Sequence, residues 1–444
     1  MKKQLLSAIL CASMVAGTFA GAGAVMADDA AAEGSVLNVK VWNTEFISRV
    51  TDHYPGYEKV DDTTGKIGDV TVNWQITANE GNAYQDNLDQ ALLAQADAAP
   101  DDKVDMFLIE ADYALKYVNA ETPVAMSMEE LGITEDDLSK QYEYTKDVVR
   151  DANGVQRASS WQTAASGLIF NREAAKEVLG TDDLDAVQEA VKDWDTFNET
   201  AAKMKEAGYK MTASANDTYR VYSNNVTKKW VEDGQIQIDD NIMKWVEDSK
   251  ALVDAEETGT FDLWSDDWSK GFYPEGKVFC YFGPAWFFNF CLAADDEGSI
   301  AHNGGWGFVN GPQGFNWGGT WICGAVGTDN PTLVKDIILA MTTDNDIMKE
   351  IAQKDTDCVN NREVLAELAA DDSGNVALLG GQNPYGVLSA GAELIDMKNI
   401  SSYDQGCNEK FQQDMKGYFD GTSTLEEALA QFDSEVKTLY PALA

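Results

Sequence analysis

Val36-Leu37-Asn38-Val39-Lys40-Val41-Trp42 decides the fold of this chain, because it opens a repeated pattern of strands and helices. Residues 70–76 form a second run of alternating apolar and polar side chains, and residues 104–109 form a buried apolar strand. Between these two strands, residues 83–96 have the spacing of an amphipathic helix. The order strand, helix, strand predicts right-handed crossovers and a parallel sheet, so we expect an α/β fold.

The remainder of the chain predicts a second folding unit. Beyond residue 173 the pattern becomes mainly helical, and short strands follow late in the sequence, so the sheets are expected to draw on distant segments. A chain of 444 residues is longer than one hydrophobic core usually needs, which favours two lobes. The predicted helices cover residues 197–207, 242–254 and 333–351, and the late strands cover residues 278–282 and 320–326.

Residues 1–27 have the pattern of a secretory signal peptide. Two lysines precede the apolar run 5–21, and Val25-Met26-Ala27 supplies the small residue of a cleavage site. Residues 28–35 are expected to form a disordered linker. No later run reaches the roughly 18 apolar residues that a membrane helix needs. The protein is therefore expected to be exported, to the cell surface or the periplasm.

The composition argues against several classes of partner and site. The chain has 33 basic and 75 acidic residues, a net charge of −42, and its acidic residues are dispersed. Such a surface repels nucleic acid and anionic lipid, and it keeps an exported protein soluble. Two histidines, and five mature cysteines without metal-like spacing, argue against a zinc site and a His-based triad. No cofactor, metal or catalytic residue is therefore predicted.

Several tryptophans stand beside Gly and Pro rather than inside apolar stripes. They occur in Gly283-Pro284-Ala285-Trp286 and in Asn316-Trp317-Gly318-Gly319-Thr320-Trp321. A loop of this kind brings a flat indole face to a cleft wall, which favours a flat, hydroxylated and uncharged ligand, a neutral sugar. Several such rings suit an oligosaccharide. Core packing is instead favoured for the tryptophans in periodic or helix-like segments, namely Trp74, Trp194, Trp230, Trp245, Trp264 and Trp268.

Polar side chains follow two of the predicted strands. Trp42, Asn43 and Glu45 come after the first strand, and Glu110 and Asp112 come after residues 104–109. Ligands of open parallel sheets bind beyond the carboxyl ends of the strands, so these residues are candidate ligand contacts. Glu110 and Asp112 could instead cap the helix that follows, because acidic side chains stabilise a helix N-terminus without any ligand.

A series of motifs gives the chain a family resemblance. Their order resembles that of the extracellular solute-binding proteins of carbohydrate ABC importers, the class that includes the maltose-binding proteins, over essentially the whole mature chain. The matching segments are 41–46, 194–197 with 201–209, 272–278 leading into 283–286, and 306–308 through 311–312 to 317–321.

The resemblance implies a two-lobed periplasmic-binding-protein fold of type II, with mixed, mainly parallel sheets and the ligand cleft between the lobes. The N-terminal lobe would comprise residues 36–165 plus 311–360, and the C-terminal lobe residues 166–310 plus 361–444. The chain would cross between the lobes near residues 164–171, 308–314 and 360–363. The protein would act as a monomer that captures a sugar and delivers it to a membrane permease.

The resemblance also adds site residues. It places Trp161 and Gln162 at the cleft, and it makes the segment before the last helices a further candidate. Family members from Gram-positive bacteria usually carry a lipid-anchored cysteine after the signal peptide, but Cys11 follows Ile9-Leu10, which fits poorly and leaves the anchor open. The complete predicted ligand-binding set is Trp42, Asn43, Glu45, Glu110, Asp112, Trp161, Gln162, Trp286, Trp317, Trp321, Asn383, Tyr403, Asp404 and Gln405.

Two other functions stay open at this point. The same fold could bind a peptide, an amino acid or a polyamine, although an anionic ligand would want arginine in the cleft and only Arg157 lies near a candidate tryptophan. An exported glycoside hydrolase would also combine carboxylates with tryptophans. No catalytic motif supports the enzyme, so a binding protein is the favoured interpretation.

Overall fold

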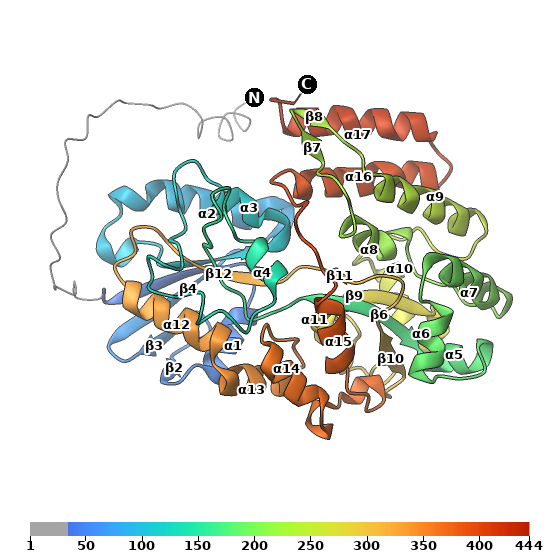
Figure 1. The fold of residues 1–444 in the computed structure, drawn as a ribbon, viewed down its shortest axis with the longest axis horizontal. Helices are drawn as coiled ribbons and strands as arrows, with labels where there is room; N and C mark the ends of the chain where they lie inside the picture. The colour runs from blue at the N-terminus through green and yellow to red at the C-terminus, as the bar shows by residue number, and fades with distance from the viewer. Residues whose placement is uncertain (1–33, 444) are drawn as a thin grey trace.

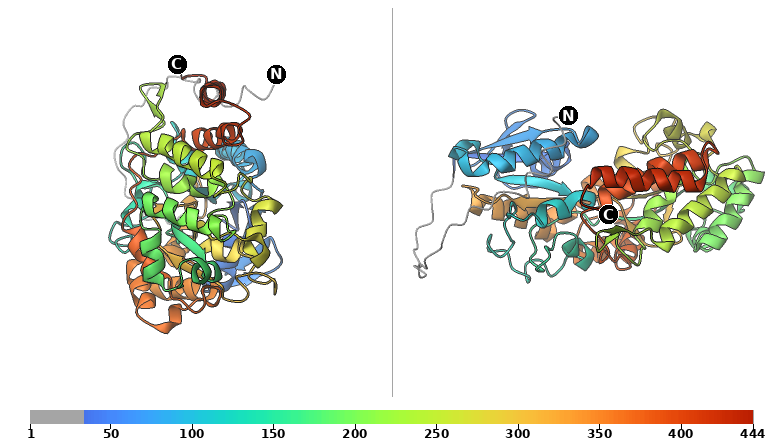
Figure 2. Two further views of the ribbon diagram at one scale, coloured as in Figure 1. Left: turned by 90° about the vertical axis from the view of Figure 1, so that its right-hand side faces the viewer. Right: turned by 90° about the horizontal axis from the view of Figure 1, so that it is seen from above.

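The computed structural model describes residues 34–443, which form two lobes side by side, each built on a sheet covered by helices (Figure 1). The view from above separates the two lobes and shows α16 and α17 on the second one (Figure 2). The predicted signal peptide and all but the last two residues of the predicted linker 28–35 lie outside the described residues. The two-lobed α/β fold is as predicted.

The first lobe is built on a six-stranded sheet. Its centre is β1, whose Leu37, Val39 and Val41 are fully buried, and β1 pairs in parallel with β4 and β5. The late strand β12 joins the edge antiparallel to β5, so distant segments meet in one sheet as predicted. The strand order is β12 (Thr320–Gly324), β5 (Met106–Glu110), β1 (Val36–Val41), β4 (Val70–Ile76), β3 (Thr64–Ile67), β2 (Tyr57–Lys59).

Helices cover both faces of this sheet. In Figure 1, α2 and α3 lie on one side of it, and α1 and α12 lie on the other. The bounds are α1 (Glu45–His53), α2 (Ala83–Ala94), α3 (Ala114–Val118), α4 (Glu143–Asp147), α12 (Pro331–Thr343) and α13 (Asn345–Asp355).

The second lobe is built around β6 (Ala165–Asn171), which is buried along its whole length. It pairs antiparallel with β9 (Cys280–Pro284), β10 (Trp306–Val309) and β11 (Phe315–Asn316). The other elements of this part of the chain are α5 (Arg172–Val178), α6 (Leu184–Ala190), α7 (Trp194–Glu206), α8 (Tyr219–Ser223), β7 (Val231–Glu232), β8 (Gln235–Ile236), α9 (Asp240–Asp254), α10 (Asp266–Ser269), α11 (Ala285–Phe290), α14 (Arg362–Ala369), α15 (Tyr385–Ala392), α16 (Asp404–Phe419) and α17 (Leu425–Leu439).

Capping side chains explain where the predicted helices begin and end. The helix predicted over 197–207 begins three residues earlier, because Asp193 and Thr196 form a capping box ahead of α7. The helix predicted over 333–351 is two helices. The side chain of Asp344 accepts hydrogen bonds from the amides of Asp346 and Ile347, so it ends α12 and starts α13.

Two expectations about the sheets need correction. The sheets are mixed, but they are not mainly parallel, since within residues 34–443 only the pairings of β1 with β4 and β5 are parallel. The second crossing also falls later than residues 308–314, because β10 and β11 both pair with β6 while β12 pairs with β5. The chain therefore changes sheets at Trp317 to Gly319. Gly318 and Gly319 adopt positive φ angles of 70° and 100° there, which side chains with a Cβ disfavour.

Across the described part of the chain, no helix combines the length and the apolar character that a membrane span requires.

Candidate ligand-binding site

A pocket of about 50 Å³ lies where the carboxyl end of β5 in the first lobe meets α8 and the start of α16 in the second. Pockets that enclose a drug-sized ligand have volumes of roughly 300–1,000 Å³, so this pocket is smaller than a site of that kind. The pocket is lined from both lobes and from the crossing segment, by residues that include Asp112, Arg220, Asn224, Asn316, Gly318 and Asp404.

An ion pair joins the two lobes at this pocket. Asp112 follows β5, and its two carboxylate oxygens accept hydrogen bonds of 2.5 Å from Nη1 and Nη2 of Arg220 on α8. The guanidinium carbon also lies 6.0 Å from the ring centre of Trp317. The two side chains are only 23% and 19% exposed, so solvent screens the pair weakly. Sequence reasoning proposed Asp112 but missed Arg220, because nothing in the local sequence links α8 to the first sheet.

Glu110, the last residue of β5, lies beside this pair. Its Oε2 accepts a hydrogen bond of 2.9 Å from the amide of Asp112, so one oxygen caps the short helical turn at 111–113, as the alternative interpretation of the sequence suggested. Burial, followed by the neighbouring Asp112 carboxylate, raises the pKa of Glu110 to about 8. A carboxyl held so far from its ordinary pKa in a cleft is a candidate binding group.

Three tryptophans form a cluster, and one of them, Trp286, lies close to Gly318, as Glu110 does. The ring of Trp317 lies 5.6 Å from the rings of both Trp286 and Trp264, and the indole N–H of Trp286 donates to the carbonyl of Trp317 at 3.1 Å. Trp264 is 57% exposed and has a positive φ of 70°. The prediction that Trp264 packs in the core is therefore wrong, because its loop turns the ring outward over the other two tryptophans.

The comparisons with known proteins agree with this architecture. Residues 60–374 match the bacterial extracellular solute-binding protein family. The chain belongs to this family. No curated protein is similar enough in sequence to this solute-binding protein to count as a match.

Solved structures share the fold over nearly the whole chain. An extracellular solute-binding protein of family 1 has a TM-score of 0.71 at 14% identity, covering 90% of this chain and 99% of that one. The sugar-binding protein MalE from Xanthomonas citri has a TM-score of 0.66 at 12% identity, covering 91% and 97%. A galacto-N-biose-/lacto-N-biose I-binding protein from Bifidobacterium longum, in complex with lacto-N-biose, has a TM-score of 0.66 at 11% identity, covering 94% and 98%.

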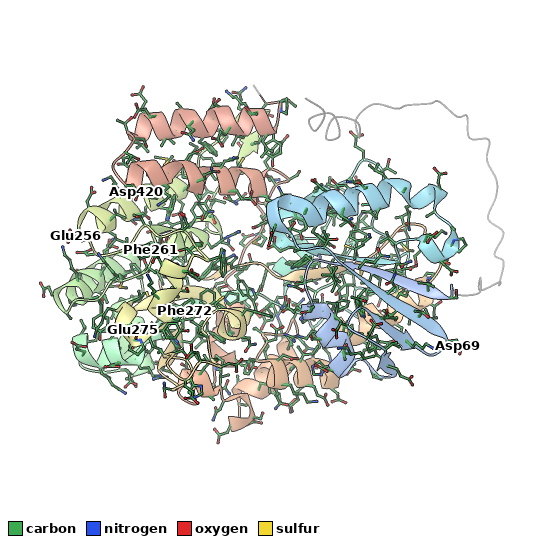
Figure 3. The ribbon with its side chains drawn as sticks, turned by 180° about the vertical axis from the view of Figure 1, so that it is seen from behind. Asp69, Glu256, Phe261, Phe272, Glu275 and Asp420 are labelled. Atoms are coloured by element: carbon green, nitrogen blue, oxygen red, sulfur yellow. The ribbon has the colours of Figure 1, made fainter. Side chains whose placement is uncertain are left out.

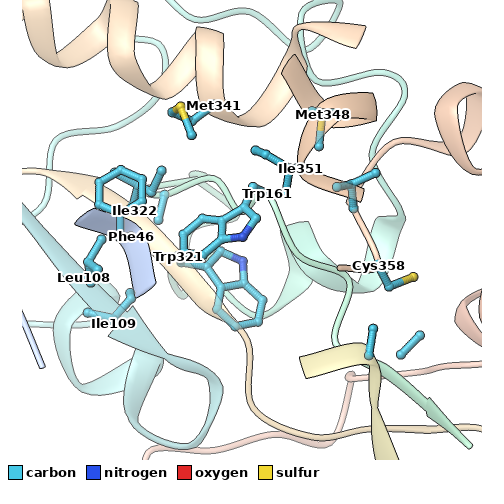
Figure 4. Close-up of a cluster of buried hydrophobic side chains, with 14 of the residues drawn as sticks. Phe46, Leu108, Ile109, Trp161, Trp321, Ile322, Met341, Met348, Ile351 and Cys358 are labelled. Carbon is cyan, nitrogen blue, oxygen red and sulfur yellow. The ribbon is translucent and has the colours of Figure 1, made fainter. Parts of the chain in front are cut away.

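Two of the tryptophans predicted to contact ligand belong to the core of this solute-binding protein. Trp161 and Trp321 are fully buried and lie together among apolar side chains (Figure 4). Trp161 stacks on Phe46 with ring centres 5.3 Å apart, and the Trp321 N–H donates to the carbonyl of Thr145 at 2.7 Å. The prediction that these rings line the cleft is wrong. Their indole N–H groups find partners inside the protein, so a glycine beside a tryptophan does not imply an exposed ring.

Gln162 and Glu45 belong to a buried polar network. Gln162 is 2% exposed, its amide donates to Glu45 at 2.8 Å and to Asp357 at 3.1 Å, and its carbonyl accepts from Thr320. The prediction that Gln162 lines the cleft is therefore wrong. Burial, followed by the carboxylate of Asp357, raises the pKa of Glu45 to about 7, although Arg49 lies 3.7 Å away. This network fastens α1 to the chain at residue 357, and a ligand contact of Glu45 stays a prediction.

The two other residues after β1 do not line the pocket. Trp42 is half-buried, with its ring 5.4 Å from that of Tyr84 and 6.4 Å from that of Tyr113. Asn43 is exposed and accepts a hydrogen bond from the amide of Glu45 at the start of α1. Their contact with ligand stays a prediction.

Of the three predicted site residues at the start of α16, only Asp404 lines the pocket. Burial raises the pKa of Asp404 to about 7 although Ser401 donates to it. Gln405 is a second bridge between the lobes, since it accepts from Gln85 and donates to Asn82, both at 3.1 Å. The ring of Tyr403 lies 4.9 Å from that of Tyr440, and both rings pack against the hydrophobic core of the second lobe.

Two further residues have structural partners. The amide of Asn383 donates to the carbonyls of Leu368 and Asp371 and its oxygen accepts from the amide of Tyr385, so it anchors the start of α15, and its contact with ligand stays a prediction. Arg157, the arginine considered from the sequence, pairs with Asp151 at 2.9 Å within the first lobe. The arginine of the pocket is Arg220 instead.

Proposed function

We propose that this solute-binding protein is the ligand-capturing subunit of an ABC importer for a carbohydrate. One observation carries the proposal: the pocket between the lobes is lined by Asp112 and by Gly318, and Gly318 lies beside Trp286, a member of the cluster of three tryptophans. The C–H face of a sugar ring packs against indole, and its hydroxyls donate hydrogen bonds to carboxylates. The likeness to solved sugar-binding proteins supports the same conclusion.

Closure of the lobes is the event that the importer would recognise. A sugar that touches both lobes favours the closed arrangement by its higher affinity for that state. The membrane permease then receives the closed, loaded protein, which we expect to act as a monomer outside the cell after removal of residues 1–27. We infer capture without chemistry, so the sugar should be released unchanged.

A ligand screen tests this function. The mature protein, starting at Asp28, is mixed with mono- and oligosaccharides and with amino acids, peptides and polyamines, and its melting temperature is recorded. A ligand that binds the native state must raise that temperature. A rise with saccharides, confirmed by calorimetry, supports the proposal. A response to peptides or polyamines alone overturns the choice of ligand.

Product analysis separates capture from hydrolysis. Each saccharide that stabilises the protein is recovered after incubation and separated by chromatography. Intact saccharide supports the binding protein, whereas shorter products indicate the alternative of an exported glycoside hydrolase.

A further inference from the structure

Four asparagine side chains line the pocket between the lobes. Asn224 ends α8, Asn316 lies on β11 and Asn408 lies on α16. Asn399 belongs to the segment between α15 and α16. Asn316 and Asn408 are only 2% and 8% exposed, and the other two are half-buried. A side-chain amide has a donor end and an acceptor end, so its hydrogen bonds inside the protein decide which end it presents to the pocket.

Asn408 and Asn224 present their N–H ends. Oδ1 of Asn408 accepts hydrogen bonds from the indole N–H of Trp230 at 3.0 Å and from the hydroxyl of Tyr219 at 2.6 Å. Oδ1 of Asn224 accepts one from the backbone amide of Asn316 at 2.8 Å. An indole or backbone N–H only donates, so the atom that faces it is the oxygen and the free atom is Nδ2. Among residues 34–443, neither Nδ2 has a hydrogen-bond partner.

Asn316 and Asn399 present their oxygens instead. Nδ2 of Asn316 donates to the carbonyl of Gly318 at 3.3 Å, and Nδ2 of Asn399 donates to the carbonyl of Val226 at 2.8 Å. A backbone carbonyl only accepts, which leaves Oδ1 as the free atom of each side chain. No group in the described part of the chain donates to either oxygen. The pocket therefore offers two N–H donors and two carbonyl acceptors, all of them neutral.

Each charged side chain that lines the pocket is already bonded to another residue: Asp112 to Arg220, Asp396 to Lys398 at 3.0 Å, and Asp404 to Ser401 at 2.6 and 3.0 Å. Much of the acidic excess lies elsewhere, since Asp69, Glu256, Glu275 and Asp420 are exposed around the outside of the lobes (Figure 3). The groups left for a ligand are therefore the neutral amides. A cation would meet the N–H ends and an anion would meet the oxygens, whereas a hydroxyl donates and accepts and so suits both.

The size of the pocket limits the ligand group that enters it. Its volume is about 50 Å³. One water molecule needs roughly 10–15 Å³ of such space, so the pocket has room for about three to five non-hydrogen atoms. A pyranose ring does not fit, whereas the hydroxymethyl arm of a hexose, one carbon and one hydroxyl, does. The apolar part of the lining, Val226, Met397 and Ile400, suits the carbon of that arm.

We propose that the pocket receives the hydroxymethyl arm of one hexose unit of the captured saccharide. The hydroxyl accepts from the N–H ends of Asn224 and Asn408 and donates to one of the two free oxygens, which uses its whole hydrogen-bonding capacity. The inference rests on the proposed function and refines its substrate class to hexose-containing saccharides. A pentose or a 6-deoxy sugar would leave the amides unpaired, and the carboxylate of a uronic acid would face two oxygens.

Matched saccharides test the proposal. Calorimetry measures the dissociation constants of cellobiose and of xylobiose, two β-1,4-linked disaccharides that differ only in the hydroxymethyl groups. Maltose and lactose are compared in the same way with derivatives that are deoxygenated at C6 of either ring. We expect at least one hexose disaccharide to bind about tenfold more tightly than its counterpart, a difference of about 1.4 kcal/mol.

Asn408→Asp identifies the amides that are responsible. It keeps the oxygen that Trp230 and Tyr219 use and turns the free donor into an acceptor, so we expect the ratio of hexose to counterpart affinity to fall about tenfold. Asn224→Asp makes the same change at a half-buried position and serves if the first variant does not fold. Asn119→Asp is the matched control, because Asn119 is exposed after α3 and its Oδ1 accepts from the backbone amide of Ala152 at 2.7 Å. Circular dichroism confirms that each variant folds.

The outcomes separate the inference from the function on which it rests. A fall of the ratio in either pocket variant, with the wild-type ratio in Asn119→Asp, supports the proposal. Equal binding of the hexose disaccharides and their counterparts overturns the hydroxymethyl site and leaves sugar capture intact. A hexose preference that survives in both pocket variants, or that falls equally in the control, overturns the role of these amides. A lack of binding to every saccharide overturns the carbohydrate function itself.

Discussion

Replacing Arg220 by alanine should open the ligand-free protein. Arg220 on α8 and Asp112 after β5 form the bidentate ion pair that joins the two lobes. The variant removes both charge-assisted hydrogen bonds and leaves Glu110 and Asp112 side by side without a cation. Only the closed arrangement contains the pair, so the arrangement in which the lobes touch loses stability relative to an open one.

The exposure of the two side chains sets the size of the effect. A fully exposed pair contributes at most about 1 kcal/mol. Removing one partner of a fully buried pair costs about 3–5 kcal/mol. With its partners 19% and 23% exposed, Arg220–Asp112 lies between these limits, and we expect about 2 kcal/mol. That energy changes the ratio of closed to open protein by about thirtyfold.

Small-angle X-ray scattering measures the result. The radius of gyration of the ligand-free Arg220→Ala variant should exceed that of the wild type, and Asp112→Asn should give the same change. Arg150→Ala is the control, because Arg150 pairs with Glu143 and Asp147 inside the first lobe and is 26% exposed. Identical scattering of Arg220→Ala and wild type would refute the bridge. Equal expansion of the Arg150→Ala control would show that the effect is general loosening.

Three further predictions concern the tryptophans and the buried carboxyl of Glu45. Trp161→Ala should lower the free energy of unfolding in urea by about 3–5 kcal/mol, because it leaves a cavity beside Phe46. Trp264→Ala should change that energy by less than about 1 kcal/mol, since the ring is 57% exposed, yet weaken calorimetric sugar binding by about 1 kcal/mol. Finally, the unfolding free energy should fall as the pH rises from about 4.5 to about 7, because Glu45 keeps its proton in the folded protein up to about pH 7 and releases it near pH 4.5 when unfolded. Glu45→Gln should flatten this slope, and an unchanged slope would contradict the assignment.

The sequence predicts the parallel centre of the first sheet, β1, β4 and β5, because its signals are local. The alternation in β1 and β4, the apolar run of β5 and the periodicity of α2 each lie within a dozen residues of chain. The sequence predicts the second crossing too early because β11 is a strand of two residues, Phe315–Asn316, which is too short to carry a periodic pattern. The two glycines that follow β11 belong to the crossing itself, whereas their place beside tryptophans predicts a ligand-binding loop.

The tryptophans show where sequence reasoning stops. Trp317 and Trp321 stand in one glycine-rich segment, yet the first is only partly buried, in a cluster with Trp264 and Trp286, and the second is fully buried in the core. What separates them is that Trp321 lies on β12, a strand that pairs with β5 and is buried along its whole length. Trp264 is the opposite case. Its acidic sequence setting predicts a helix and a packed ring, but the residue lies in a loop and its ring is 57% exposed. Exposure is a property of the packed fold, so neighbours in sequence cannot supply it.

The candidate site follows from the topology of the two lobes. The strand-end rule found Glu110 and Asp112 because it describes the edge of a sheet. It could not find Arg220, which reaches the same place from the second lobe, whereas Trp286 is predicted from its Gly-Pro setting. Because the carboxylates come from one lobe, and the facing cation or indole comes from the other lobe or the crossing, no group that fills the space at Gly318 can touch its full set of partners until the lobes meet. Affinity for such a ligand and closure around it are then one equilibrium, and any variant that weakens the contact between the lobes must weaken binding as well.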